Sequence, residues 1–263
     1  WIKFALLLNC WVFREAFNLN ILLTRTLSQV QPLQTLVSQS GYQPILFPSL
    51  EVEALSNAPL KNHYDVLIFI SSNAVEYGLE TLKNLEHQQC KFFAVGAATA
   101  NKLNEYGFKV DAFPSERASS EALLAMPEVK ALVSKDILIF RGKGGRETLR
   151  EGLEQYNTVE YIEVYQRVVC DITPLHHSSL SEFLQSNKGI ITATSVENLS
   201  ALLSIIEQID ASVLATIKHY PLAVLSERIK NFAQSVGFSQ IEIATQTSDQ
   251  GLLKAIQYLL TQH

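Results

Sequence analysis

Apolar and amphipathic stretches alternate along most of this chain. Residues 21–24 form an apolar run of strand length, and residues 32–40 then place apolar side chains at helical spacing. Gly41 follows, where a glycine often ends a helix, and residues 44–48 form a second apolar run. A strand, a helix, a glycine and a strand in this order predict a βαβ unit, and therefore a parallel sheet.

The predicted βαβ unit recurs 116 residues later along the chain. Residues 137–149 (ILIFRGKGGRETL) align with residues 21–33 (ILLTRTLSQVQPL). This alignment places Arg141 opposite Arg25, each directly after an apolar run. The recurrence of a whole unit indicates two parts of similar architecture.

Other matching segments lie between and after these two units. The stretch that starts at Val66 matches the stretch that starts at Gly189, and the match pairs Ser71 with Ser195. A further strand-and-helix pattern follows each of them. The same set of units is therefore used twice, and we expect each set to form a five-stranded, doubly wound sheet with helices on both faces.

The order of the repeated units leaves two chain paths open. The chain could build two consecutive domains, or it could leave the first domain, build a whole middle domain and return. In the second path, residues 47–53 and 163–170 would cross between domains, and both segments are β-prone enough to pair. No tether rich in Gly, Ser or Pro marks a break near the midpoint, which favours the interleaved path.

Composition limits the classes of function that this fold can serve. The 263 residues are 47% hydrophobic and 18% charged, with a formal net charge of −5. These values exclude a disordered, collagen-like or coiled-coil chain, and the acidic balance argues against a dedicated nucleic-acid binder. No apolar run reaches the roughly 18–20 residues that span a bilayer. We therefore expect neither a nucleic-acid nor a membrane partner.

Cysteine and histidine spacing predicts no metal site. Cys10, Cys90 and Cys170 lie about 80 residues apart and form no CxxC pair. The six histidines include the neighbours His176 and His177 but no zinc-binding pattern. Free thiols in a reducing compartment are the expected state, which places the protein in the cytoplasm.

The first eighteen residues differ from the rest of the chain. The segment WIKFALLLNCWVFREAFN has an apolar run that stops at Asn9, and no small-residue cleavage site follows it. We expect residues 1–18 to be an extension outside the fold.

Candidate chemistry gathers directly after the predicted strands. Arg141, Gly142 and Arg146 belong to RGKGGRE, where glycine N–H groups, a helix start and cationic side chains could hold a carboxylate or phosphate. A tight turn with solvated charges explains the same residues equally well. The segment is neither a Walker A loop nor a dinucleotide-binding fingerprint.

Other post-strand positions carry small or hydroxyl residues. Ser71, Ser72 and Asn73 suit a helix N-cap, and the segment AVGAATA places Gly96 and Thr99 at a strand-to-helix turn. No GxSxG elbow, Cys–His signature or paired-carboxylate motif is present. Tyr165, in VYQR, is a polar aromatic on the second crossing segment, where a half-buried core role is the common alternative. If two sheets face one another across such a linker, their strand ends line a cleft.

Taken together, these segments resemble the uroporphyrinogen-III synthase family. ILLTR resembles the family's opening strand, FISSNAV its F-[TS]-S-x-N-A-V segment, and AVGAATA its V-G-x-x-T-A helix start. RGKGGRETL resembles the stretch L-R-G-x-x-G-R-E-x-L, and VYQR resembles the strand V-Y-x-[RT]. Each motif is weak alone, but five in order at the right distances are specific. The resemblance covers residues 20 to about 260.

The resemblance implies an α/β protein of two flavodoxin-like, doubly wound parallel-sheet domains. A two-stranded β linker joins them, and the first domain is discontinuous. On this interpretation domain 1 is 19–46 with 170–263, domain 2 is 53–162, and the linker strands are 47–52 and 163–169.

The resemblance also implies an activity. The family cyclises linear hydroxymethylbilane to uroporphyrinogen III, with loss of water and inversion of ring D through a spiro intermediate. No metal or organic cofactor is expected, and a transient contact with porphobilinogen deaminase would supply the unstable substrate. We expect a monomer, because no unexplained apolar repeat suggests an obligate interface.

Site roles carry over by position. Tyr165 matches the tyrosine thought to assist loss of the ring A hydroxyl, and is the catalytic candidate. The expected substrate-binding residues are Arg25, Ser71, Ser72, Asn73, Gly96, Thr99, Arg141, Gly142, Arg146, Ser195, Ser226 and Arg228. The chain departs from the family at its second G-x-T-A-like turn, where Ile229 stands in place of the threonine. Arg228 could bind a propionate there instead.

Two other functions are compatible with the residues. A synthase-like porphyrin or anion binder would keep the site and lack turnover. A nucleotide- or sugar-phosphate-binding α/β enzyme is disfavoured, because the phosphate fingerprints are absent.

Overall fold

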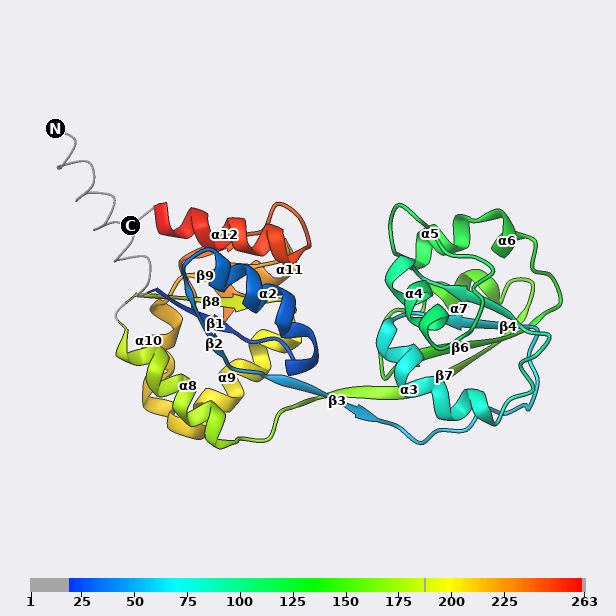
Figure 1. The fold of residues 1–263 in the computed structure, drawn as a ribbon, viewed down its shortest axis with the longest axis horizontal. Helices are drawn as coiled ribbons and strands as arrows, with labels where there is room; N and C mark the ends of the chain where they lie inside the picture. Colours follow the sequence, from blue (N-terminus) through cyan, green and yellow to red (C-terminus); the bar gives the residue numbers. More distant parts are fainter. Residues whose placement is uncertain (1–18, 187, 262–263) are drawn as a thin grey trace. The chain divides into compact units, whose positions relative to one another are not determined.

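The computed structural model of the protein describes residues 19–186 and 188–261. The predicted extension 1–18 lies outside the described residues. The chain divides into two compact units (Figure 1). Unit 1 consists of the described residues up to Glu51 together with those from Val168 onward, and unit 2 is Val52–Arg167. Unit 1 is therefore assembled from two distant stretches of the chain.

Unit 1 contains a five-stranded sheet in the order β10-β9-β8-β1-β2. All four strand pairs are parallel. The strands are β1 (Asn20–Leu23), β2 (Gln43–Leu46), β8 (Gly189–Ala193), β9 (Leu222–Val224) and β10 (Ile241–Ile243). Strands β1, β8 and β9 are buried along their whole length, as the continuous apolar runs of a covered parallel sheet require.

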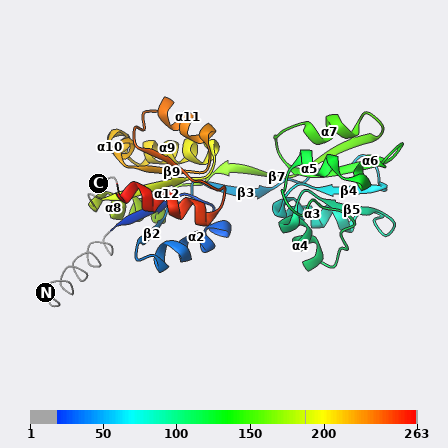
Figure 2. The same ribbon diagram turned by 90° about the horizontal axis from the view of Figure 1, so that it is seen from above.

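Helices cover both faces of the unit 1 sheet (Figure 2). The helical elements are α2 (Leu27–Gln39), α8 (Pro174–Gln185), α9 (Val196–Asp210), η1 (Ala211–Val213), α10 (Leu214–His219), α11 (Glu227–Ser235) and α12 (Asp249–Thr261). Helices α2 and α12 bury one apolar cluster against the sheet, and α8 to α11 bury the other.

Two features of unit 1 differ from what the hydrophobic pattern of the sequence indicated. The helical spacing over residues 32–40 is confirmed, but it marks only part of the helix, because α2 begins at Leu27 and contains Pro32. Packing of Val30, Leu33 and Val37 into the core outweighs the local preference for proline at a helix start. The stretch Val196–His219 is long and apolar enough to cross a membrane by composition. Its α9 residues belong to the unit 1 core, so we interpret it as a core helix.

Unit 2 contains a second five-stranded sheet in the order β3-β7-β6-β4-β5. The pairs β4–β5, β4–β6 and β6–β7 are parallel. The strands are β3 (Leu50–Ala54), β4 (Val66–Phe69), β5 (Lys91–Ala94), β6 (Asp136–Gly142) and β7 (Thr158–Val169). The first two residues of β3 and the last two of β7 fall within the stretches assigned to unit 1. An isolated parallel bridge joins Phe93 to Ala112 beyond β5, at the place that β10 holds in unit 1.

Helices again cover both faces of the unit 2 sheet. They are α3 (Ser72–Lys83), α4 (Ala97–Glu105), α5 (Ser120–Ala125), α6 (Pro127–Lys130) and α7 (Thr148–Leu153). Helices α3 and α4 cover one face and α5, α6 and α7 the other. The strands β6, β7, β4 and β5 thus match β1, β2, β8 and β9 in neighbour order, as the internal repeat predicts.

Candidate functional site

The predicted site residues of unit 2 lie at the carboxyl ends of its parallel strands. Ser71 follows β4, Gly96 follows β5, and Gly142 ends β6. Tyr165 lies on β7 opposite Gly142, after a register shift between Arg141 and Gly142. Parallel strands present these ends at one edge of the sheet, where open α/β sheets bind ligands.

Tyr165 is held closely at this edge. Its side chain is 5% exposed, and its hydroxyl lies 3.1 Å from the Ser71 hydroxyl. A Cβ atom on Gly142 would lie 2.6 Å from the Tyr165 ring, so only glycine leaves room for the ring. The centroid of the Tyr77 ring lies 5.9 Å away. Tyr165 therefore offers a substrate only a small part of its surface.

Ser71 is also the N-cap of α3. Its hydroxyl oxygen accepts a hydrogen bond of 3.0 Å from the Ala74 N–H. Ser72 and Asn73 form the first turn of α3 and are half-buried, and the Ser72 hydroxyl lies 3.5 Å from the Ala98 carbonyl oxygen. The prediction of a capped helix start at this edge is confirmed.

Gly96 and Thr99 begin the neighbouring helix, α4, and both are buried. A Cβ atom on Gly96 would lie 2.3 Å from the Cβ atom of Ala118. The close approach that this glycine permits is therefore to Ala118, whereas the sequence suggested an approach to substrate. The substrate contacts of Gly96 and Thr99 stay predictions.

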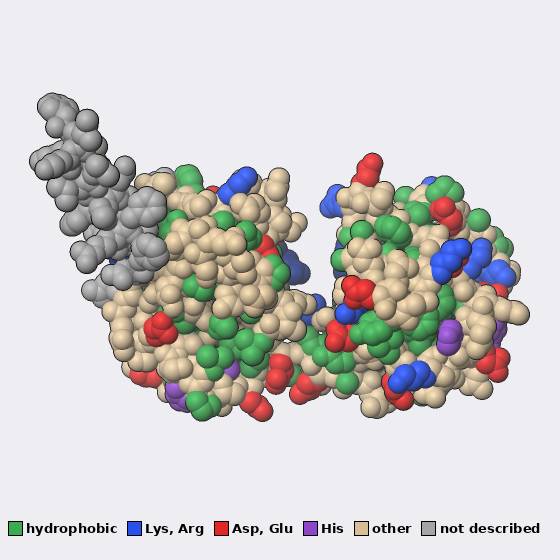
Figure 3. All heavy atoms as spheres, in the orientation of Figure 1, with side chains coloured by type: hydrophobic (Ala, Val, Ile, Leu, Met, Phe, Trp, Pro, Cys, Tyr) green, Lys and Arg blue, Asp and Glu red, His purple; other side chains and the backbone are tan. Residues whose placement is uncertain are grey.

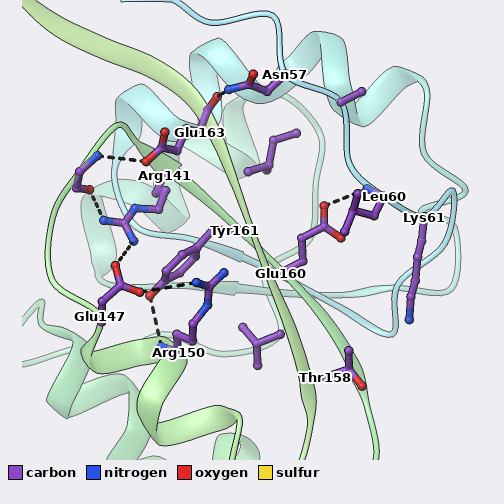
Figure 4. Close-up of a pocket in the computed structure, with 14 residues that line it drawn as sticks. Asn57, Leu60, Lys61, Arg141, Glu147, Arg150, Thr158, Glu160, Tyr161 and Glu163 are labelled. Atoms are coloured by element: carbon purple, nitrogen blue, oxygen red, sulfur yellow. Dashed lines mark hydrogen bonds and ion pairs between the residues drawn. The ribbon is translucent and has the colours of Figure 1, made fainter.

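Arg141 was expected to offer its guanidinium to an anion, and the structure gives it partners within the protein (Figure 4). Its side chain is 3% exposed and bonds to the Gly142 carbonyl at 3.3 Å, to the Gly144 carbonyl, and to Glu147 at 3.0 Å. A buried guanidinium must have its N–H groups satisfied, and this one is used to fix the turn after β6. The idea of a free cationic cradle at Arg141 therefore needs correction.

Arg141 and Arg150 both pack against the ring of Tyr161. Their guanidinium carbons lie 4.2 Å and 4.0 Å from the ring centroid, and both side chains form an ion pair with Glu147. Burial raises the pKa of Tyr161 above its usual value. Arg146 lies on the same turn and is largely exposed in an ion pair with Glu121, at 2.6 Å. A pair so exposed adds little to stability.

A pocket of about 720 Å³ lies beside β7, and sequence reasoning missed it (Figure 4). Its ionisable lining residues are Lys61, Arg141, Glu147, Arg150, Glu160, Tyr161 and Glu163. The charges largely offset each other, and Tyr64 donates a short hydrogen bond to Glu160. Burial and this bond raise the pKa of Tyr64. The pocket combines residues 57–61, 141–150 and 158–163, so no single local motif marks it in the sequence.

The predicted residues of unit 1 lie at the corresponding edge of its own sheet. Arg25 follows β1 and forms an ion pair with Asp249, with 2.5 Å between Nη1 and Oδ1. Ser195 caps α9 and accepts a hydrogen bond of 3.0 Å from the Asn198 N–H. Ser226 is the N-cap residue of α11 without a side-chain cap bond, and Arg228 is exposed in its first turn.

A buried polar network lies directly behind Ser195. The Asn198 amide donates to the Thr24 carbonyl at 2.7 Å and to the Ser49 hydroxyl at 2.6 Å. Its carbonyl oxygen accepts from the Thr24 hydroxyl at 2.6 Å, and the Ser49 hydroxyl also donates to the Asn198 backbone carbonyl at 2.9 Å. The three side chains come from segments more than 20 residues apart, so no local motif marks them.

The described residues contain no group of three or more His, Cys, Asp or Glu that could hold a metal ion. His176 is buried at the N-terminus of α8, where its Nε2 donates to the Pro48 carbonyl at 2.8 Å. Its Nδ1 accepts from the Thr173 N–H at 3.1 Å. This histidine therefore serves as a helix cap. Cys90 and Cys170 are free thiols, and burial raises the pKa of Cys170 to about 11.

Comparison with known proteins assigns the family. The family profile described as uroporphyrinogen-III synthase HemD matches residues 31–254. The chain is 30% identical over 244 residues to uroporphyrinogen-III synthase of Escherichia coli K12, covering 89% of this chain and 92% of that protein. It is 29% identical over 254 residues to the Salmonella typhimurium enzyme, covering 91% of this chain and 100% of that protein.

Solved structures share the fold. Uroporphyrinogen-III synthetase from Helicobacter pylori superposes with a TM-score of 0.60 at 20% identity, over 92% of this chain and 99% of that chain. A mutant synthase from Thermus thermophilus superposes with a TM-score of 0.54 at 15% identity, over 93% of this chain and all of that chain. The profile spans most of the chain, and this chain belongs to the uroporphyrinogen-III synthase family.

Proposed function

We propose that this protein cyclises linear hydroxymethylbilane to uroporphyrinogen III, losing water and inverting ring D. The observation that carries the proposal is a tyrosine hydroxyl fixed at the carboxyl edge of a parallel sheet, in a chain that belongs to this family. The position of Tyr165 agrees with the family's V-Y-x-[RT] strand, and the enzyme is a cyclising lyase of tetrapyrrole biosynthesis.

The reaction requires the protein to orient the bilane and to supply one proton. The pyrrole nitrogen of ring A pushes out the hydroxyl group, and the Tyr165 hydroxyl gives its proton to that leaving group, so that water departs and the azafulvene remains as a cation beside the phenolate. The azafulvene carbon then bonds to ring D at the carbon that already carries the chain. Fragmentation and re-closure of the resulting spiro intermediate invert that ring, and the proton lost on aromatisation returns to the phenolate.

Orientation decides which isomer forms. The bilane closes spontaneously without inversion, so the enzyme must hold ring D for the inverting path. Fixing two reacting groups in one geometry can contribute about 7–11 kcal/mol to lowering a barrier. A site with one hydroxyl and no obvious acid–base pair suits this task.

The eight carboxylate arms of the bilane need donors rather than a basic protein. Helix N-termini supply N–H groups and partial positive charge, and Ser71, Ser195 and Ser226 each begin a helix at a sheet edge. Arg228 is exposed beside one of these starts and is the arginine that we assign to a propionate. We also assign Arg25 and Arg146 to substrate binding. Each would exchange its carboxylate partner within the protein, Asp249 or Glu121, for a carboxylate arm of the bilane.

We also propose that each unit is a flavodoxin-like domain. Numbered in chain order, the unit 1 strands lie in the order 5-4-3-1-2, which supports this topology. In unit 2, β7, β6, β4 and β5 keep the neighbour order of β2, β1, β8 and β9, although they follow a different order along the chain. The proposed domains are 19–46 with 170–263 and 53–162, joined by linker strands 47–52 and 163–169. A cytoplasmic monomer that receives its substrate in a transient contact with porphobilinogen deaminase completes the proposal.

The test couples the purified full-length protein to porphobilinogen deaminase, oxidises the products and separates the porphyrin isomers by chromatography. Mostly isomer III is the expected result. Only isomer I, formed by spontaneous closure, would contradict the proposal. Tight uroporphyrin binding together with isomer I alone would instead identify a porphyrin binder without turnover.

A further inference from the structure

We propose that Ser71 is a positioning residue that aims the Tyr165 hydroxyl and stabilises its oxygen when the proton leaves. The proposal rests on the proposed function, because it concerns the same proton transfer. It adds a role for Ser71 that is exerted through Tyr165, whereas the family resemblance implies only a contact between this serine and substrate.

Three groups form a short hydrogen-bonded chain. The Ala74 N–H donates to the Ser71 hydroxyl oxygen at 3.0 Å, and the Ser71 hydroxyl lies 3.1 Å from the Tyr165 hydroxyl. Ala74 lies in the first turn of α3, a helix of twelve residues. The chain therefore links the N-terminus of α3 to the phenol oxygen.

The direction of the second hydrogen bond follows from the reaction. Each hydroxyl carries one proton, and the Tyr165 proton must point to the leaving group if it is to be transferred. Ser71 must then be the donor to Tyr165. Its own oxygen stays satisfied, because it accepts from Ala74.

This arrangement favours the state in which the proton has left. The phenolate oxygen accepts from Ser71, and a hydrogen bond to a charged acceptor is stronger than one to a neutral acceptor. The Ala74 N–H and the positive end of α3 polarise the serine in the same sense. Ser71 thus contributes more to the transition state than to the ground state, which is the condition for catalysis.

The backbone fixes the distance that this bond needs. Gly142 leaves the space that the Tyr165 ring fills, and β6 and β7 place the two residues in register. The ring is buried and has little freedom to turn away. A buried ring held on one side and bonded at its hydroxyl has the pre-organisation that a proton donor requires.

The corresponding cap in unit 1, Ser195, shows that a serine can cap a helix at a sheet edge without a hydrogen bond to a tyrosine among the described residues. Ser195 accepts from the Asn198 N–H at the same 3.0 Å. The residue three positions after the cap is Asn198 in unit 1 and Ala74 in unit 2, and the Asn198 side chain bonds to Thr24 and Ser49. The same cap therefore occurs in two settings, and the tyrosine contact belongs to unit 2.

A double-mutant cycle on the full-length protein tests the inference, with turnover measured as isomer III formed from deaminase-generated bilane. We expect Ser71→Ala to lower kcat about tenfold, with KM changed less than about twofold. This loss is smaller than the roughly 10²–10⁴-fold of direct proton transfer, because Ser71 acts through Tyr165. In the Tyr165→Phe background the same substitution should have no further effect on kcat. Ser71→Thr keeps a hydroxyl and should recover much of the turnover.

Two variants separate positioning from helix capping. Ser71→Asp keeps an acceptor for the Ala74 N–H and folds as a capped helix, but a carboxylate cannot donate to Tyr165, so its kcat should fall at least as far as that of Ser71→Ala. Ser119→Ala removes the cap of α5, where the Ala122 N–H donates at 3.1 Å, and should cost similar stability with kcat unchanged.

Each result of these experiments either supports or overturns the inference about Ser71. Wild-type kcat in a folded Ser71→Asp variant overturns the inference. An equal loss of kcat from Ser71→Ala with and without the Tyr165 hydroxyl also overturns it, and leaves the proposed function intact. A wild-type protein that yields only isomer I removes the proposed function and this inference with it.

Discussion

The two sheets end in edges of the same design that hold different chemistry. In both, a serine follows a central strand and caps a helix through the N–H three residues later. Behind Ser195, the Asn198 side chain closes a buried network with Thr24 and Ser49. Behind Ser71, the side chain at the matching position is only Ala74, and the Tyr165 hydroxyl bonds to the serine instead.

Under the proposed function, the difference separates a structural edge in unit 1 from a reactive edge in unit 2. In unit 1 the buried polar groups satisfy one another, which fixes three chain segments but leaves no donor to spare. In unit 2 the Tyr165 hydroxyl shares one bond with Ser71, and in the proposed mechanism the serine donates, so that the tyrosine proton is available for transfer.

The two units also differ in their number of charged residues. Unit 2 contains 13 Lys or Arg and 16 Asp or Glu, whereas the described part of unit 1 contains 6 and 9. On the face drawn in Figure 3, charged side chains are correspondingly denser over unit 2 than over unit 1. Most cations of the unit 2 turn after β6 have carboxylate partners within the protein, so a larger number of charges does not make a stronger anion site.

The largest predicted effect on stability concerns the buried network behind Ser195. Asn198→Ala should lower the free energy of unfolding by about 2–4 kcal/mol, because it removes the three buried hydrogen bonds that the Asn198 side chain makes with Thr24 and Ser49. Chemical denaturation measures the change. Asn101→Ala, at an exposed position of α4, is the control and should stay within about 0.5 kcal/mol. Equal small effects of both substitutions would remove the structural role assigned to the network.

Gly142→Ala should disturb the reactive edge. The added Cβ would lie 2.6 Å from the Tyr165 ring, so the ring must move, at a cost of about 1–3 kcal/mol in stability. We expect turnover to fall with it by about tenfold, since a misplaced group loses its catalytic advantage. Gly107→Ala is a control in the same unit. It introduces strain at a φ of +84° with open space around it, and should leave turnover unchanged. Full turnover in Gly142→Ala would show that the ring position is not critical.

The smallest predicted effect on stability concerns Arg228. Arg228→Ala removes an exposed side chain and should change the unfolding free energy by less than about 0.5 kcal/mol. If Arg228 binds a propionate, KM should rise several-fold while kcat stays near the wild-type value. Steady-state kinetics with the coupled assay measure both. An unchanged KM would remove Arg228 from the binding surface.

Much of the fold could be predicted from the sequence, because the internal repeat reinforced secondary-structure signals that are weak individually. Apolar runs of the right length mark β1, β4, β6 and β8, and the aligned repeats indicate which helices follow which strands. The first turns of α2 were not predicted, because Val30 packs against the core ahead of Pro32, where the sequence pattern gave no helix signal.

The positions of the candidate site residues were predictable where the backbone determines them. Ser71 and Gly142 reach one edge because they follow or end parallel strands, and Tyr165 reaches it because the register of β7 places it opposite Gly142. The partner of Arg141 was not predictable, because a cationic residue after a strand looks the same whether it faces an anion or Glu147. The Thr24–Asn198–Ser49 network was missed for a related reason, since its members meet only after the discontinuous unit 1 has assembled.

The most direct test of the account is the turnover of Tyr165→Phe against Tyr77→Phe. Both substitutions remove one hydroxyl in unit 2, and the Tyr77 hydroxyl only donates to the Val52 carbonyl, at 3.2 Å. We predict that Tyr165→Phe forms isomer III at a tenth of the wild-type rate or less, a fall of at least about 1.4 kcal/mol in transition-state stabilisation, with thermal stability preserved. Tyr77→Phe should stay close to the wild-type rate. Wild-type turnover in a folded Tyr165→Phe protein would contradict the account.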